Sequence, residues 1–437
     1  MSGLAVPSPS ARADAADIDR LASPWAWPVA VLALCHGQAI ASFQILNVLV
    51  DPIRASLHIS DTQYSLLQGL AVAIFSAALG VPAARWADRH SRRNVILAGA
   101  LGWSLATVAC AFVISFPQFF VARVVMGIGE VFLFPAALAL IAELVPREKL
   151  STAIACFGIG GPLGGAAAMF AGGWLIGHAG AEQGWRTAFL ACGVSGLLTA
   201  TLLLTVADPR RTARAVHPSF AQVLGYIAER SRLFLPVTAG MICLSLCAFA
   251  GAAWAPTALS RAYGIPTGTA GELTAASSLL GGVLLTWTAG WLVDRLAAKG
   301  DPASPLTLGI ALCLGLASLV GSAVLLVPAS AGAGFWLVTY SLLAVPTVLG
   351  GTAFQMITAP RVRAQVMAIY LLLMNLIALS LGPFIVAYVT DHVFEAPERV
   401  HQSLAIVIAV AAALGGASLA AARKRFSKAA AARFADF

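Results

Sequence analysis

The sequence has very little charge for its length. Only 11% of its 437 residues are Asp, Glu, Lys or Arg, and 59% are hydrophobic. An average soluble domain carries about 25% charged residues. The composition therefore excludes an ordinary soluble protein and predicts a protein of the lipid bilayer.

Motifs that support catalysis are also absent. The sequence has no Gly-x-x-x-x-Gly-Lys-Ser/Thr phosphate loop, no His-Glu-x-x-His and no Gly-x-Ser-x-Gly. Its seven cysteines lack the spacing of a zinc site and fall in apolar stretches. These absences exclude ATP-driven transport by this chain alone. We expect no enzymatic activity, no cofactor and no metal.

Long apolar runs dominate what is present. A helix needs about 20 apolar residues to cross a bilayer, and twelve stretches meet this length. They cover residues 25–49, 63–84, 95–115, 118–144, 151–177, 185–206, 233–259, 270–293, 306–327, 334–357, 364–390 and 403–422. The sequence therefore predicts an all-α, multi-pass membrane protein with twelve transmembrane helices.

Basic residues alternate between the two sides of the predicted membrane. Of 27 Lys and Arg, 22 lie in the tails (1–24 and 423–437) and in every second connection, and four lie in the other connections. By the positive-inside rule both termini are cytoplasmic. The first 24 residues also lack the basic start and short apolar core of a signal peptide, so we expect the first span to be retained. The net charge of +8 indicates orientation and contact with the bilayer surface rather than nucleic-acid binding.

The twelve spans divide into two similar halves. A polar, basic linker over residues 207–232 contains a short amphipathic stretch and separates residues 25–206 from residues 233–422. Asp88-Arg89 and Asp294-Arg295 follow equivalent spans 206 residues apart. Such spacing predicts two six-helix bundles of the same orientation.

The connection after the second span reads ARWADRHSRR over residues 84–93. Its Asp88, Arg89, Arg92 and Arg93 can form ion pairs that close the cytoplasmic side, and Asp294 with Arg295 repeats the element in the second half. We therefore expect gating residues there. The alternative is that these charges only fix the topology.

This connection resembles the signature of the major facilitator superfamily, Gly-x-x-x-Asp-Arg-x-Gly-Arg-Arg/Lys, with Ala84 and Ser91 in place of its glycines. A narrower resemblance over about residues 50–400 is to the bacterial spinster-like branch. It rests on LHISDTQYSLLQG (57–69), RVVMGIGE (123–130) and NLIALSLGP (375–383), among other segments. The resemblance implies two bundles around a central cavity, lined by Arg123 and Glu130, with a proton-sensing role for the glutamate. The charged run that such proteins commonly carry in the first span is missing here.

Glu130 is also informative without the resemblance, because it lies in the otherwise apolar stretch 124–142. Charge at that depth costs about 3 kcal/mol or more. Arg123 lies nearly two turns earlier on the same helix face, about 10 Å away, and Gly127 and Gly129 between them leave room for a substrate. We expect Glu130 to take up and release a proton as its hydration changes, and Arg123 to stabilise its anion or to bind an anionic head group. The alternative is a structural polar pair.

Other polar residues within the spans are weaker candidates. His36 lies halfway along the first span and is a candidate proton relay, or a hydrogen-bonded structural histidine. The candidates for the substrate-binding wall, besides Arg123 and Glu130, are Gln38, Trp254, Tyr340 and Asn375. A wall this poor in charge favours an amphipathic or lipid-like substrate.

We therefore predict a monomeric secondary active transporter of the bacterial inner membrane. It would work by alternating access and be proton-coupled. The first alternative is an uncoupled facilitator or exporter of small organic anions or sugars. Two alternatives from other classes are a membrane sensor or signalling protein and a membrane enzyme acting on lipid. Both would be favoured by soluble domains, for which this sequence leaves little room.

Overall fold

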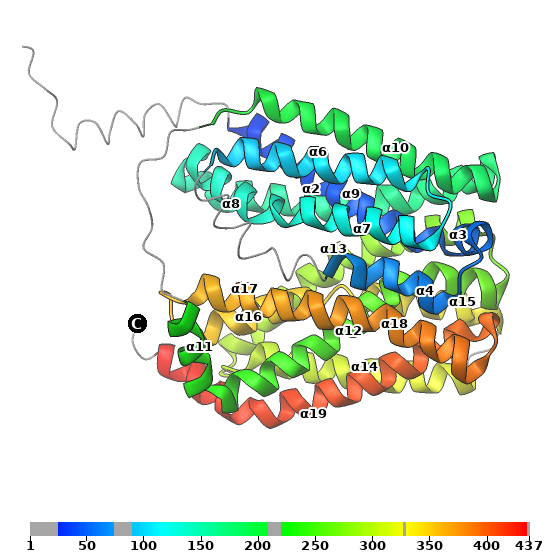
Figure 1. The fold of residues 1–437 in the computed structure, drawn as a ribbon. Coiled ribbons are helices and arrows are strands. Elements are labelled where there is room, and N and C mark those ends of the chain that lie inside the picture. Colours follow the sequence, from blue (N-terminus) through cyan, green and yellow to red (C-terminus); the bar gives the residue numbers. More distant parts are fainter. Residues whose placement is uncertain (1–24, 74–89, 209–219, 327–328, 435–437) are drawn as a thin grey trace, which may run out of the picture.

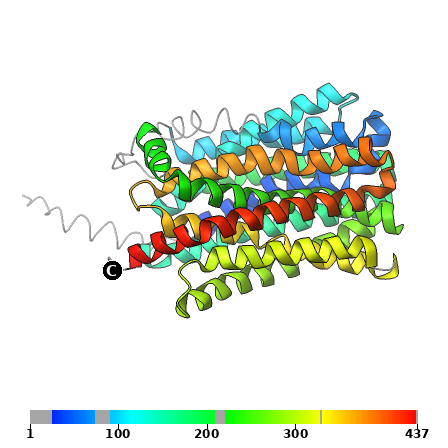
Figure 2. The same ribbon diagram turned by 90° about the horizontal axis from the view of Figure 1, so that it is seen from below.

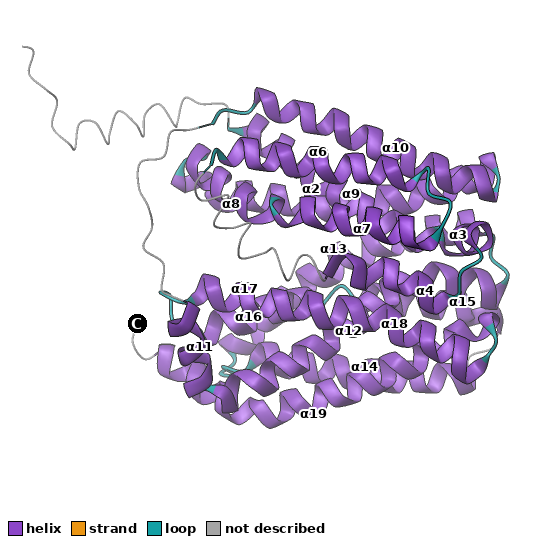
Figure 3. Ribbon diagram, viewed as in Figure 1, coloured by secondary structure: helices purple, strands orange, loops and turns teal. Residues whose placement is uncertain are grey.

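The computed structural model describes residues 25–73, 90–208, 220–326 and 329–434, and every regular element in these ranges is a helix (Figure 3). Nine helices in this part are long and apolar enough to cross a membrane. Two further apolar helices, at 304–320 and 348–357, are shorter. The predicted span 63–84 lies partly outside the described residues. The all-helical membrane fold is thus confirmed.

The helices before the linker form one group, which we call the N bundle. In chain order they are α2 (Ala26–Gln44), η1 (Ile45–Val48), α3 (Val50–Leu57), α4 (Asp61–Ser65), η2 (Leu66–Leu70), α6 (Arg92–Cys110), α7 (Phe116–Val131), α8 (Leu133–Leu144), η3 (Arg147–Lys149), α9 (Leu150–Ala179), α10 (Ala181–Leu202) and η4 (Leu203–Thr205).

The helices after the linker form the C bundle. They are α12 (Ser231–Tyr263), α13 (Thr267–Ala298), α14 (Ser304–Leu326), α15 (Ala329–Leu342), α16 (Pro346–Ile357), α17 (Arg363–Leu373), η5 (Met374–Leu379), α18 (Ser380–Val389), η6 (Thr390–Phe394), η7 (Pro397–Arg399) and α19 (Val400–Phe434).

Proline breaks two spans at equivalent places. The span 118–144 divides into α7 and α8, with Pro135 in the first turn of α8. The span 334–357 divides into α15 and α16, and Pro346 is the first residue of α16. Proline has no N–H to donate, so a helix ladder is interrupted there. The recurrence supports the two-repeat interpretation.

The two bundles lie side by side, with α4 and η2 against α18 and with α9 against α13 (Figure 1). The chain enters α2 and leaves α19 at the same end, which we call the proximal end and which the charge pattern predicts to be cytoplasmic. The opposite end, with α3 and the start of α19, is the distal end.

The predicted amphipathic stretch of the linker is confirmed as α11 (Phe220–Glu229). Its Tyr226 hydroxyl accepts a hydrogen bond from the backbone N–H of Ala359 at 3.2 Å and lies 3.4 Å from the carbonyl oxygen of Ile357. This contact attaches α11 to the proximal end of α16.

Candidate functional site

Arg123 is a fully buried cation in α7. Its Nε donates to the carbonyl of Leu67 at 3.0 Å, and its Nη1 donates to the carbonyl of Ser42 at 3.3 Å. Leu67 lies in η2, a π-helical turn, and such turns loosen the regular backbone ladder. The guanidinium thus joins α7 to α2 and η2 inside the N bundle.

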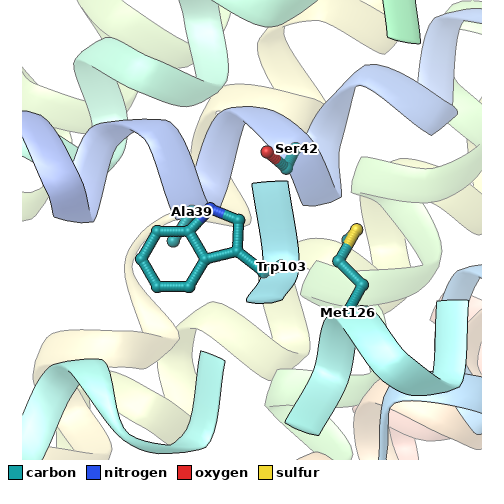
Figure 4. A pocket seen from close by; sticks show the side chains of 4 residues that line it. All are labelled: Ala39, Ser42, Trp103 and Met126. Carbon is teal, nitrogen blue, oxygen red and sulfur yellow. The ribbon is translucent and has the colours of Figure 1, made fainter. Parts of the chain in front are cut away.

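The surroundings of Arg123 are closely packed. Figure 4 shows a small recess lined by Ala39, Ser42, Trp103 and Met126, and it leaves no room for a water molecule. Met126 Sδ lies 3.4 Å from Arg123 Nη1. A substrate on this side of Arg123 would have to displace side chains.

Glu130 belongs to α7, seven residues after Arg123, and its side chain lies outside the described part of the structure. The two glycines before it are contact positions between helices. A Cβ on Gly129 would lie 2.7 Å from the carbonyl oxygen of Gly99 in α6, and one on Gly127 would lie 3.0 Å from Val72. These glycines therefore let neighbouring helices approach, and the space expected there for a substrate is taken by α6 and Val72.

His36 joins an aromatic group from three helices. Its ring stacks on Phe157 of α9 at 4.8 Å between centroids and meets the edge of Phe134 of α8 at 5.6 Å. Its Nδ1 lies 3.2 Å from the carbonyl oxygen of Phe157. Phe134 is 45% exposed, so this group offers an accessible apolar surface.

Gln38 lies on the other side of α2 and points to α10, where its Nε2 donates to the carbonyl of Cys192 at 2.5 Å. In the C bundle, Trp254 is fully buried and donates to the carbonyl of Pro383 at 3.0 Å. Asn375 is half-buried in η5. Tyr340 of α15 reaches across to the N bundle, with its hydroxyl 4.0 Å from Sδ of Met169. The predicted wall residues thus lie in several separate places.

Of the predicted gating residues, Asp88 and Arg89 lie outside the described residues. Arg92 forms an ion pair with Glu143, near the end of α8, and donates to the carbonyl of Ala139 at 3.0 Å. Arg93 donates to the carbonyl of Val206 at 3.3 Å. These contacts stay within the N bundle.

The half-repeat copy lies on an exposed part of α13. Asp294 and Arg295 are both exposed. The guanidinium of Arg295 lies 4.9 Å from the ring centroid of Trp291 on the same helix.

Four charged residues at the distal end form a network that sequence reasoning missed, and we call them the distal ion cluster: Asp51, Arg54, Asp61 and Arg261. Arg261 of α12 binds the carboxylate of Asp61 through Nη1 at 2.7 Å and Nη2 at 2.9 Å, and it binds Asp51 through Nη2 at 2.6 Å and Nε at 2.9 Å. Arg54 Nε also contacts Asp61 at 2.9 Å. Asp61 is fully buried.

The distal ion cluster joins the two bundles, because its acids and Arg54 belong to the N bundle and Arg261 belongs to the C bundle. A second contact joins the bundles with the roles reversed, because here the acid belongs to the C bundle. Asp391 of η6 accepts hydrogen bonds at 2.7 Å from both the N–H and the hydroxyl of Thr62 in α4.

Backbone contact and an amide complete the distal junction. A Cβ on Gly173 of α9 would lie 2.6 Å from the carbonyl oxygen of Gly268 in α13. The buried amide of Gln68 donates to Asn47 at 3.2 Å and to the carbonyl of Ala253 in α12 at 3.3 Å. The bundles are therefore held together at this end by ion pairs, hydrogen bonds and close backbone packing.

Comparison with known proteins agrees with this architecture. A family profile described as Major Facilitator Superfamily matches residues 32–383. An MFS-type efflux pump of Mycolicibacterium smegmatis is 29% identical over 387 residues, covering 88% of this chain and 89% of that protein. A gallate transporter of Pseudomonas putida is 28% identical over 282 residues, covering 57% of this chain and 62% of that protein.

Among solved structures, a bacterial homologue of the human lysosomal transporter Spinster, in an inward-facing and unoccupied conformation, has the same fold. The TM-score is 0.74 at 21% identity, with 93% of this chain and 97% of that one covered. This likeness supports the spinster-like fold predicted from the sequence.

Proposed function

Since this chain belongs to the Major Facilitator Superfamily and is a membrane transporter rather than an enzyme, we propose that it moves its substrate by alternating access between the two bundles. The observation that carries this proposal is the distal ion cluster, which joins the bundles through Arg261 alone. When an interface opens, water can hydrate the separated charges of an ion pair and offset much of the lost interaction energy. Exposing a packed apolar interface to water has no such compensation. The cluster therefore suits a gate.

The proposed state is closed at the distal end. At the proximal end, the ion pairs in the described part of the chain stay within one bundle, as Arg92 with Glu143 and Arg423 with Asp301 do. If the proximal end is cytoplasmic, as the charge pattern predicts, this conformation faces the cytoplasm.

We further propose that transport is proton-coupled through Glu130. Support comes from its place in an apolar helix and from Arg123 on the same helix, since a lone intramembrane acid is most often kept for function. Arg123 is fully buried and bound to two carbonyls. That anchoring favours electrostatic stabilisation of Glu130 over direct capture of an anionic head group. His36 remains a second candidate for the proton path.

The proposed substrate is an amphipathic or lipid-like organic molecule. The accessible aromatic group of His36, Phe134 and Phe157 supports an apolar moiety. A small organic anion is the second candidate, because a gallate transporter is among the relatives.

The test is internal pH in proteoliposomes that hold wild-type protein or Glu130→Gln. Both are challenged with lysophospholipids, sphingoid bases, gallate-like aromatic acids and sugars. We expect a pH change with an amphipathic compound that the variant loses. A matched control is Glu182→Gln, which removes the charge of an exposed acid at the start of α10. Uptake of a compound with no pH change in the wild type would refute proton coupling and leave facilitated transport.

A further inference from the structure

The proximal end of the C bundle has a recess whose residues belong neither to the proposed gate nor to the proposed proton path. It lies between the α13–α14 turn, the start of α14 and the last third of α19, which runs along α14 (Figure 2). Its volume is about 720 Å³. Its lining includes Asp301, Ile310, Arg423, Lys424 and Lys428.

One acid and one base of this recess neutralise each other. Arg423 Nη2 lies 3.3 Å from Asp301 Oδ2, and its Nε donates to the hydroxyl of Thr307 at 3.1 Å. Thr307 and the N–H of Ala303 in turn donate to Asp301 at 2.5 and 3.0 Å. Partial burial raises the pKa of the Asp301 carboxyl, but these donors outweigh it and hold the pKa below its usual value. Asp301 is therefore ionised and paired.

Two cations in the recess remain available to a ligand. Lys424 and Lys428 lie one turn apart on α19, and both are exposed. Neither forms an ion pair within the described part of the chain. The recess thus presents an excess positive charge of two.

The recess also lies at the depth of lipid headgroups. Residues 400–422 of α19 precede the cations and span about 34 Å at about 1.5 Å per residue. The hydrocarbon core of a bilayer is about 30 Å thick. Arg423 and the lysines therefore begin where the hydrocarbon ends.

Next to the cations, the recess also has an apolar part. Ile310 of α14 lines it, and Leu314, one turn further along the same helix, is 64% exposed. An acyl chain that extends from a headgroup in the recess can contact these two side chains.

We propose that the recess binds the headgroup of an anionic phospholipid, with Lys424 and Lys428 contacting the phosphate and Arg423 held by Asp301 at the wall. Basic pockets between membrane helices suit such headgroups. The charge decides against a zwitterionic lipid, and the adjoining apolar surface decides against a free anion.

The test is native mass spectrometry of the full chain with phosphatidylglycerol or phosphatidylcholine. We expect the wild type to retain phosphatidylglycerol at least tenfold better than the variant Lys424→Gln/Lys428→Gln. Phosphatidylcholine should bind both equally. The control Lys149→Gln/Arg232→Gln removes two exposed cations from other proximal positions and should retain phosphatidylglycerol within twofold of wild type.

Four results would overturn the proposal. One is equal retention of both lipids by the wild type, and another is an equal loss in the control. The third is full displacement of phosphatidylglycerol by millimolar inorganic phosphate or glycerol phosphate, which would identify a free-anion site. A dimer that the lysine variant dissolves would assign the recess to a second copy instead. Equal melting temperatures in phosphatidylcholine verify that the variants are folded.

Discussion

Replacing Arg261 by methionine removes the one side chain that links the distal ion cluster across the two bundles. Methionine keeps an unbranched apolar stem of similar reach, so packing against Trp254, whose ring centroid lies 6.0 Å from the guanidinium carbon, changes little. The acids Asp51 and Asp61 stay on the N bundle, where Arg54 still contacts Asp61 at 2.9 Å. The change therefore weakens the contact between bundles more than the fold of either one.

The expected magnitude follows from burial. Breaking a buried ion pair costs about 3–5 kcal/mol when a charge is left unpaired. Here Arg54 keeps Asp61 paired, and Asp51 is 37% exposed, so its pair contributes only about 0–1 kcal/mol. We therefore expect a loss of about 2 kcal/mol from the distally closed state. At about 1.4 kcal/mol per factor of ten, the ratio of open to closed molecules rises about 30-fold.

The assay is electron–electron resonance between spin labels at Gln183 and Val393, two exposed distal positions on different bundles. The native cysteines are replaced first. Wild type should give mainly one distance, and Arg261→Met should gain a longer one. Arg399→Met is the matched control, because Arg399 is exposed at the same end and contacts Phe394 of its own bundle. An unchanged distribution in Arg261→Met, or the same change in the control, would refute the gate.

Two further predictions concern packing and charge. Gly268→Ala places a methyl group 2.9 Å from the carbonyl oxygen of Gly173. We expect this overpacking to favour distal opening by about 1–3 kcal/mol, which the same distance measurement would detect. Gly290→Ala is the control and should have no effect, because its methyl group would meet nothing within 4 Å. Asp301→Asn should reduce the loss of thermal stability at acid pH. A carboxyl whose pKa is lowered on folding stabilises the protein above its unfolded pKa, and this contribution is lost as the pH falls through the folded-state pKa. Below about pH 4 the melting temperature of the wild type should therefore fall more steeply than that of the variant, and parallel curves would contradict this.

The spans were predictable from the sequence because lipid imposes a length and an apolar composition on every crossing helix. The linker helix was predictable for a related reason, since its signal is local: a short, mostly apolar segment over 220–227 lies within a polar, basic linker. Loop charges gave the orientation, which remains a prediction. These features depend on neighbours in the chain.

The distal ion cluster was not predicted because its partners are distant in sequence. Arg261 lies 210 residues from Asp51 and 200 from Asp61, and nothing in local spacing indicates which side chains of two bundles will meet. A usable signal was present. Only four cations lie on the distal side, and acids beside Arg54 in so poorly charged a chain were candidates for an inter-bundle pair. Gly127 and Gly129 show a second limit of sequence-based prediction. A glycine in a helix is compatible both with space for a substrate and with close contact between helices, and the sequence does not tell these apart.

The distribution of ion pairs in the described residues supports the proposed state, which is closed at the distal end. In the part of the chain that the structure describes, each ion pair between the bundles includes Arg261, at the distal end. Pairs at the proximal end, such as Arg92 with Glu143, hold helices within a bundle. Opening the distal end must therefore separate Arg261 from two carboxylates, whereas parting the bundles at the proximal end breaks none of these pairs. In the proposed mechanism, a proton or substrate that reverses the conformation has to supply about the free energy of that separation, and this requirement would couple Arg261 to the proposed proton site at Glu130.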